Sequence, residues 1–130
     1  MEKVLLVGMG GFVGSIARYA LAGGVHRIAA TSSFPWGTLT VNIVGCALIG
    51  FLGGIAELRG VFRPETRLLV FIGVLGGFTT FSTFAYETLA LARGGLLAKA
   101  LGNAGFHLFG CLVAVWLGDV VARNLGAPGS

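Results

Sequence analysis

Long apolar runs separated by short polar segments dominate the sequence. No charged side chain occurs from Trp36 to Ala56, from Leu68 to Tyr86 or from Ala100 to Gly118. A fourth run, from Val4 to Leu21, contains one charged residue, Arg18. Each run reaches the roughly 17 to 25 residues that an apolar helix needs to cross a bilayer. The pattern predicts one domain covering residues 1–130, with four transmembrane helices at about 4–23, 36–56, 68–92 and 100–122.

The polar segments between these runs are too short to form a separate soluble domain. They cover residues 26–35, 57–67 and 93–99, and a Gly- and Pro-containing end at 125–130 is expected to be frayed. Charged residues make up 11% of the chain and the mean hydropathy is +0.91, whereas soluble domains average about 25% charged residues. The predicted fold class is therefore an all-α, multi-pass integral membrane protein with four transmembrane helices per subunit.

The first apolar run also has some features of a secretory signal. Lys3 precedes it, and small residues at Ala20 and Ala22 imitate a cleavage site. However, Arg18 would lie inside the apolar region of such a signal, and three further spans follow. We therefore interpret the run as the first transmembrane helix.

Basic residues are divided almost equally between the two sides of the membrane. With the N-terminus, the second loop and the C-terminus on one side, that side holds five of the nine basic residues: Lys3, Arg59, Arg63, Arg67 and Arg123. The other side holds the remaining four if Arg18 reaches the interface: Arg18, Arg27, Arg93 and Lys99. Orientation follows an excess of Lys and Arg on the cytoplasmic side. The near balance predicts insertion in both orientations, and a single orientation set by other features is the alternative.

Glycine is unusually abundant, with 23 residues. In a bilayer, small residues let helices approach closely and pack by van der Waals contact. Gly10 and Gly14 form a GxxxG step, and further glycines recur in the second and third spans. Four thin helices enclose little interior, so we expect a homodimer that buries the polar residues of the spans.

An enzyme is not predicted. Gly8 and Gly10 follow a short apolar run, as in a dinucleotide-binding turn, but the third glycine of that fingerprint is replaced by Val13. No acidic residue lies between Glu2 and Glu57 to bind a ribose, and neither a Ser/His/Asp arrangement nor paired carboxylates occur. Nothing in the sequence indicates a nucleic-acid partner either.

The two cysteines, Cys46 and Cys111, both fall inside predicted spans. They therefore do not form the disulfide framework of a secreted domain, and no Cys/His cluster indicates a zinc site. Cys46 is interpreted as a small apolar packing residue.

A few polar residues inside the spans stand out, because an unsatisfied polar group in hydrocarbon is costly. Thr38 and Asn42 are four residues apart and share one helix face. Asn103, His107 and Cys111 repeat at the same spacing in the last span. The alternative explanation is hydrogen bonding between helices, which contributes about 0.6 kcal/mol per bond.

The third span carries the most unusual stretch, GGFTTFSTF, from Gly76 to Phe84. Adjacent glycines and clustered β-branched hydroxyl residues form helix poorly, so a break is expected there. A break frees backbone carbonyls, which can bind a cation, while an amide, hydroxyls and the positive edges of Phe81 and Phe84 can face an anion. A packed aromatic face with hydroxyls bonded to the preceding turn is the alternative.

These motifs, together with Gly37-Thr38 and the segment GSIAR at 14–18, resemble the Fluc family of fluoride channels over nearly the whole chain. The resemblance implies four-helix subunits with a broken third helix, assembled in the lipid bilayer as an antiparallel, dual-topology homodimer. It also implies two fluoride pores, a structural sodium ion (Na+) at the dimer centre, and passive fluoride efflux that lowers cytoplasmic fluoride.

The resemblance further implies roles for single residues. Asn42, Phe81 and Phe84 match pore residues, the carbonyls of Gly76 and Thr79 match sodium ligands, and Arg18 matches a vestibule arginine. The family often has Ser or Asn in place of His107 and Ser in place of Cys111, so the sequence departs from it in the last span. The remaining candidates for the fluoride pore are Thr38, Ser82, Thr83, His107 and Cys111.

Two other functions remain open on the sequence alone. A small dual-topology, proton-coupled multidrug transporter would need a carboxylate deep in a span, and the first, second and fourth helices contain none at their centres. Glu87 lies just past the third-span motif. It is interpreted either as a vestibule group or as an ordinary carboxylate at a helix end. A membrane assembly factor without transport activity is the second alternative.

Overall fold

The structure is a computed structural model that describes residues 1–126, and this part of the chain contains no β-strand. It has four helical spans that are long and apolar enough to cross a membrane. They are α1 (Glu2–Ile28), α2 (Trp36–Arg59), a third span from Pro64 to Arg93 and a fourth from Leu97 to Gly126. The predicted all-α architecture with four transmembrane helices is confirmed.

The helices extend beyond the apolar runs, because charged residues are tolerated where a helix reaches the polar interface. Arg59 and Arg93, for example, are the last residues of their helices. The third span begins at Pro64, a position where the missing N–H costs no hydrogen bond. Gly60 ends α2 with φ 57°, which glycine adopts without strain. Of the end predicted to be frayed, residues 125 and 126 are helical and the rest lies outside the described part.

The third span is interrupted, as predicted. It consists of α3 (Pro64–Arg67), the π-helical segment η1 (Leu68–Leu75), α4 (Gly76–Phe78) and α5 (Phe81–Arg93). Between α4 and α5 the backbone is extended, with φ −81° and ψ 157° at Thr79 and φ −152° and ψ 112° at Thr80. The interruption therefore lies at the double threonine of the GGFTTFSTF stretch.

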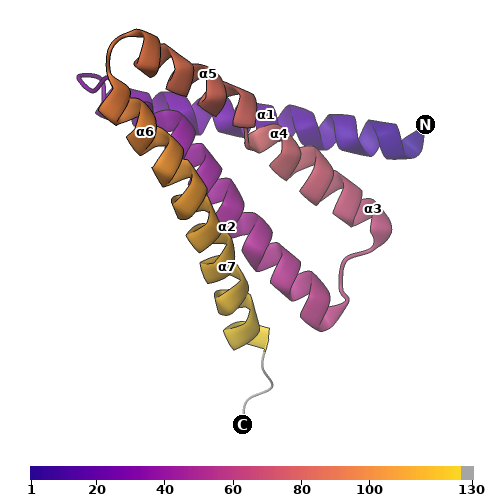
Figure 1. Cartoon of the computed structure of the whole chain (residues 1–130). Helices are drawn as coiled ribbons and strands as arrows, with labels where there is room; N and C mark the ends of the chain where they lie inside the picture. Colours follow the sequence, from indigo (N-terminus) through magenta and orange to yellow (C-terminus); the bar gives the residue numbers. More distant parts are fainter. Residues whose placement is uncertain (127–130) are drawn as a thin grey trace.

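The fourth span packs along α2. It runs through α6 (Leu97–Gly105), the π-helical segment η2 (Phe106–Gly110) and α7 (Cys111–Gly126), and Figure 1 shows α7 beside α2. Glycines let these two backbones touch: a Cβ at Gly118 would lie 2.7 Å from the nitrogen of Phe51. A Cβ at Gly54 would lie 2.7 Å from that of Ala122. The small residues therefore set the distance between the two helices.

A second glycine contact joins α1 to the third span, which it crosses over η1 and α4 (Figure 1). A Cβ at Gly73 would lie 2.9 Å from the Cα of Gly10, and one at Gly77 would lie 2.9 Å from the Cα of Gly11. Real Cβ atoms do not approach other atoms so closely. The backbone just before the break is therefore fixed against α1 without side chains between them.

Much of the outer surface is apolar. Phe109, Leu112 and Trp116 on the fourth span are 68%, 61% and 62% exposed, respectively. Soluble monomers rarely expose large contiguous patches of this kind, whereas a lipid environment favours them. The outer surface therefore agrees with a protein embedded in a membrane.

Candidate functional site

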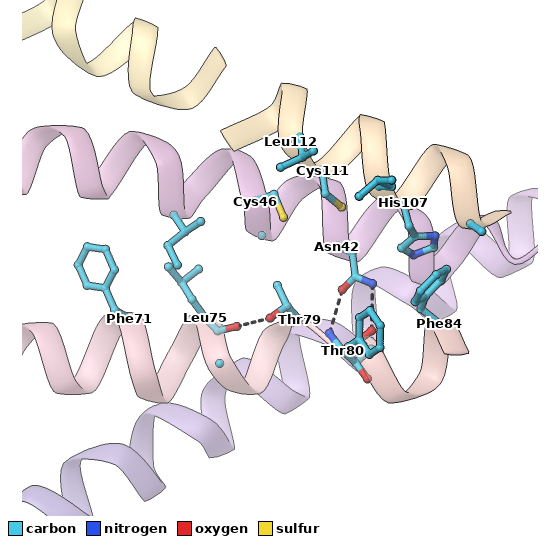
Figure 2. Close-up of a pocket in the computed structure, with 16 residues that line it drawn as sticks. Asn42, Cys46, Phe71, Leu75, Thr79, Thr80, Phe84, His107, Cys111 and Leu112 are labelled. Carbon is cyan, nitrogen blue, oxygen red and sulfur yellow. Dashed lines mark hydrogen bonds between the residues drawn. The ribbon is translucent and has the colours of Figure 1, made fainter. Parts of the chain in front are cut away.

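A cavity of about 570 Å³ lies between the broken third span and the paired second and fourth spans (Figure 2). It brings together seven of the residues predicted from the sequence: Asn42, Gly76, Thr79, Phe81, Phe84, His107 and Cys111. No Lys, Arg, Asp or Glu is among its lining residues. The cavity is thus polar at a few points and carries no fixed charge from these residue types.

Asn42 holds the broken segment in place. Its Oδ1 accepts a hydrogen bond from the backbone nitrogen of Thr80 at 2.8 Å, and its Nδ2 donates to the carbonyl of the same residue at 3.0 Å (Figure 2). The side chain is 7% exposed, so these bonds satisfy backbone groups that would otherwise be buried and unpaired. Nδ2 carries a second N–H, which no hydrogen bond within residues 1–126 uses.

The break leaves backbone carbonyls without their helical partners, among them those of Gly76 and Thr79. In a continuous helix Gly76 would accept from the nitrogen of Thr80, and Thr79 from the nitrogen of Thr83. The Thr80 nitrogen instead bonds Asn42, and the Thr83 nitrogen donates to the hydroxyl of Thr80 at 3.3 Å. Gly76 and Thr79 also line the cavity. Their carbonyl oxygens are therefore available as ligands.

The hydroxyls of Ser82 and Thr83 gather at the start of α5. The Thr80 hydroxyl donates to that of Thr83 at 3.0 Å and lies 3.4 Å from that of Ser82. Thr80 thereby acts as the N-cap of α5. Neither Ser82 nor Thr83 is among the cavity-lining residues, so the structure does not bring these two candidates to Asn42.

Three rings form one wall of the cavity. The centroids of Phe81 and Phe84 are 5.2 Å apart at 65°, an edge-to-face arrangement. Phe84 also stacks on His107 with centroids 4.2 Å apart (Figure 2). Phe81 is 78% exposed in the single chain. Phe84 is therefore held by its neighbours, whereas the Phe81 side chain is largely uncovered by the rest of residues 1–126.

His107 presents an unpaired ring nitrogen. Its Nδ1 lies 3.0 Å from the carbonyl oxygen of Asn103, and since a carbonyl only accepts, Nδ1 is the donor. In the neutral imidazole Nε2 therefore carries a lone pair, and this buried atom has no hydrogen-bond partner within residues 1–126. Asn103 donates to Thr88, which in turn donates to the Phe84 carbonyl. Through these bonds Asn103 links the fourth span to the third.

Two predicted residues lie away from the cavity. The Thr38 hydroxyl donates to Oε1 of Glu87 at 2.8 Å, and the buried Oε2 of that carboxylate has no partner within residues 1–126. Arg18 is half-buried in α1 and is not among the lining residues. The sequence predicts a pore role for Thr38 and a vestibule role for Arg18, and neither residue is among those that line the cavity.

Sequence reasoning gave no site role to Thr80 and interpreted Cys46 as a packing residue, yet both residues line the cavity. Thr80 lies in the GGFTTFSTF stretch. The sequence indicates a break there, but it does not show which residue's backbone Asn42 binds. Cys46 is one helical turn beyond Asn42, so its i+4 spacing was the available signal.

The fold and the cavity together define a class of protein. Non-helical backbone at membrane depth is tolerated only where it is buried in protein or lines a polar cavity, as in channels and transporters. This chain is thus a multi-pass membrane protein with a broken helix beside a largely apolar cavity that contains a few uncharged polar groups.

Residues 5–119 match the family model described as "CrcB-like protein, Camphor Resistance (CrcB)", and the chain belongs to this family. A relative from Methylobacillus flagellatus named "Fluoride-specific ion channel FluC" is 47% identical over 118 residues, covering 91% of this chain and 92% of the relative. Relatives with the same name from Geobacter sulfurreducens and Nitratidesulfovibrio vulgaris are 46% and 48% identical. The alignment with the Geobacter sulfurreducens relative covers 96% of this chain and 100% of the relative, and that with the Nitratidesulfovibrio vulgaris relative covers 91% and 94%, respectively. The resemblance to the Fluc family is confirmed.

Proposed function

We propose that this chain forms a fluoride-selective channel that mediates passive fluoride efflux across the cytoplasmic membrane and lowers cytoplasmic fluoride. The observation that carries this proposal is the uncharged cavity at the broken third span, where Asn42 holds the backbone of Thr80. The names of the relatives support fluoride as the permeating ion. The chain is a channel and not an enzyme.

The cavity offers what a small, strongly hydrated anion needs when its water is removed. Donors must replace part of the hydration shell, and binding must stay weak enough for the ion to leave. The second N–H of Asn42, the Cys111 thiol and the ring edges of Phe81 and Phe84 are weak, uncharged groups of this kind. A lysine or arginine at this point would hold the ion more firmly, and none lines the cavity.

The remaining pore candidates extend this route. Thr38, with Glu87, and the hydroxyls of Ser82 and Thr83 supply polar groups on the α5 side of the break. Arg18 would attract anions to a vestibule at one end. His107, as a neutral imidazole, offers only a lone pair at Nε2, so it favours fluoride only when it is protonated.

The functional unit is an antiparallel, dual-topology homodimer with two pores. The single chain leaves Phe81 78% exposed beside a cavity that a second copy would close. The balance of basic residues allows one copy to insert in each orientation. Both observations support an assembly in which each pore uses residues of two chains.

A sodium ion at the dimer centre is the structural cofactor in this proposal. The carbonyls of Gly76 and Thr79 fit such an ion, because both have lost their helical N–H partners. Oxygen ligands without charge suit a hard monovalent cation, as in the carbonyl rings of ion channels. When bound, sodium would stabilise the break rather than take part in fluoride movement.

Purified protein in liposomes tests the proposed function. Vesicles loaded with fluoride should release it down its gradient, without a proton gradient, as followed with a fluoride electrode. The alternative of a proton-coupled multidrug transporter draws on Glu87, a carboxylate in α5 with one unpaired oxygen. Drug-driven proton movement without fluoride release would support that alternative, and silence in both assays would support an assembly factor.

A further inference from the structure

The two cysteines meet in the cavity from different helices. Cys46 lies on α2 and Cys111 begins α7, and the sticks in Figure 2 show both thiols directed into the same space. Both cysteines line this cavity, and both are free thiols. They are separated by 65 residues along the chain, so the pairing is a product of the fold.

We propose that Cys46 and Cys111 form a two-sulfur binding site for a soft monovalent metal ion of the Cu(I) or Ag(I) class. Thiolate sulfur is the ligand that such ions prefer over oxygen, and two sulfurs in a roughly linear arrangement satisfy them. Hard cations such as Na+ and Mg2+ prefer oxygen ligands and should not bind this pair. Within residues 1–126 no group of three His, Cys, Asp or Glu residues is placed to hold a metal ion, so the site is limited to the two sulfurs.

A second observation in the same cavity favours a soft cation. His107 is 6% exposed, lines the cavity, and carries the lone pair at Nε2 that no group in residues 1–126 occupies. An imidazole lone pair is a good ligand for Cu(I) and a poor neighbour for an anion. The same cavity therefore contains an imidazole lone pair in addition to the two sulfurs, and no carboxylate is among its lining residues.

The charge balance of the site follows from its place in the membrane. One thiol loses its proton and forms the metal–sulfur bond as thiolate, while the second sulfur coordinates as a thiol. The metal contributes +1 and the thiolate −1, so the complex is neutral, as a low-dielectric site requires. One proton is released per metal ion, and no oxidant or reductant takes part.

The consequence for transport rests on the proposed function. A metal ion held between Cys46 and Cys111 occupies the cavity next to Asn42, where fluoride would pass. Soft metal ions should therefore block fluoride efflux from the inside of the pore rather than at its mouth.

Silver binding to the purified protein tests the site directly. In chloride-free nitrate buffer, equilibrium dialysis with elemental analysis should give one Ag(I) per chain. Cys46→Ser and Cys111→Ser, both nearly isosteric, should each weaken binding at least tenfold. The absence of bound silver, or unchanged affinity in the double variant, would overturn the proposal.

Chemical protection provides a check that needs no variant. In the unaltered protein, Ag(I) should slow alkylation of both cysteines by a small neutral maleimide at least tenfold, as read by mass spectrometry of each peptide. Equal rates with and without silver would overturn the site even if the serine variants fail to fold.

Fluoride efflux from liposomes separates the site from the proposed function. Ag(I) should lower fluoride efflux by the unaltered protein at least tenfold, and a dithiol chelator should reverse this block. The double variant should keep the efflux rate that it has without silver. If silver binds both sulfurs but fluoride efflux is undiminished, the metal site stands and the cavity does not lie on the fluoride path. Untreated protein without efflux would reject the proposed function, while dialysis would still decide the site.

Discussion

The side chain of Asn42 binds both the nitrogen and the carbonyl of Thr80, at 2.8 and 3.0 Å. One amide thus supplies the donor and the acceptor that the extended backbone at the break has lost. Because the amide is bonded on both sides, its orientation is fixed, and so is the direction of its second N–H. Any change at Asn42 therefore affects both the break and the cavity.

Asn42→Asp should abolish most fluoride efflux while the protein remains folded. The carboxylate can still accept from the Thr80 nitrogen, but it places an oxygen against the Thr80 carbonyl and removes the donor that would face the ion. Loss of one partner in a buried hydrogen bond costs about 1–3 kcal/mol. We expect efflux from liposomes to fall at least tenfold.

Asn124→Asp is the matched control, because it makes the same chemical change at an exposed position near the end of α7. It should leave efflux and thermal stability close to those of the parent. An Asn42→Asp protein that is well folded and conducts at the parent rate would remove this amide from the pore.

Phe81→Ile should lower fluoride efflux without a comparable loss of stability. Phe81 is 78% exposed in the single chain, so little packing within the chain depends on it, while isoleucine deletes the ring edge that would face the ion. Phe109→Ile, at a position 68% exposed on the fourth span, is the control for loss of an exposed ring. Equal efflux from both variants would favour a packing role for Phe81.

Gly77→Ala should destabilise the fold, because its Cβ would lie 2.7 Å from the carbonyl oxygen of Gly11. Forcing an extra carbon into a close backbone contact typically costs about 1–3 kcal/mol. Gly53→Ala, with no atom within 4 Å of its added Cβ, should be neutral or slightly stabilising. Thermal unfolding in detergent, followed by circular dichroism, compares the two, and equal melting temperatures would contradict the glycine contact.

Reporter fusions at the C-terminus should report from both sides of the membrane. The five-to-four division of basic residues gives almost no orienting preference. Adding about three lysines to the segment 57–67 should force one orientation. Signal from one side only, in the unaltered chain, would exclude dual topology.

Replacing sodium with a large organic cation should lower dimer stability over hours, because a buried ion leaves slowly. The expected ligands are backbone carbonyls of Gly76 and Thr79, so Thr79→Ser should bind sodium as the parent does. Thermal unfolding of the dimer at several sodium concentrations measures the effect. A melting temperature independent of sodium would reject the structural ion.

The spans and the break could be predicted because they depend on local sequence. Charge-free runs indicate the four helices, and the poor helix formers around Thr79 and Thr80 indicate the interruption. These features need no knowledge of how the helices are arranged. The family resemblance assigned pore roles to Asn42, Phe81 and Phe84, all of which line the cavity.

The partners of individual hydroxyls could not be predicted in the same way. Thr38 shares a helix face with Asn42, yet it bonds Glu87, which the crossing of α2 and α5 brings within 2.8 Å. The Thr80 hydroxyl turns toward Ser82 and Thr83 because the first turn of α5 offers an unpaired backbone N–H at Thr83. Such choices depend on helix rotation and crossing, which spacing along one chain does not determine.

The contact between α1 and the third span has a consequence for how this protein can change. Where backbone meets backbone at Gly10, Gly11, Gly73 and Gly77, no side chain can relax by changing its rotamer. The position of the break is thus set by main-chain geometry, which most substitutions leave alone. Residues that line the cavity, such as His107 and Cys111, can be exchanged while this frame stays in place, so new ion preferences can arise by mutation without rebuilding the fold.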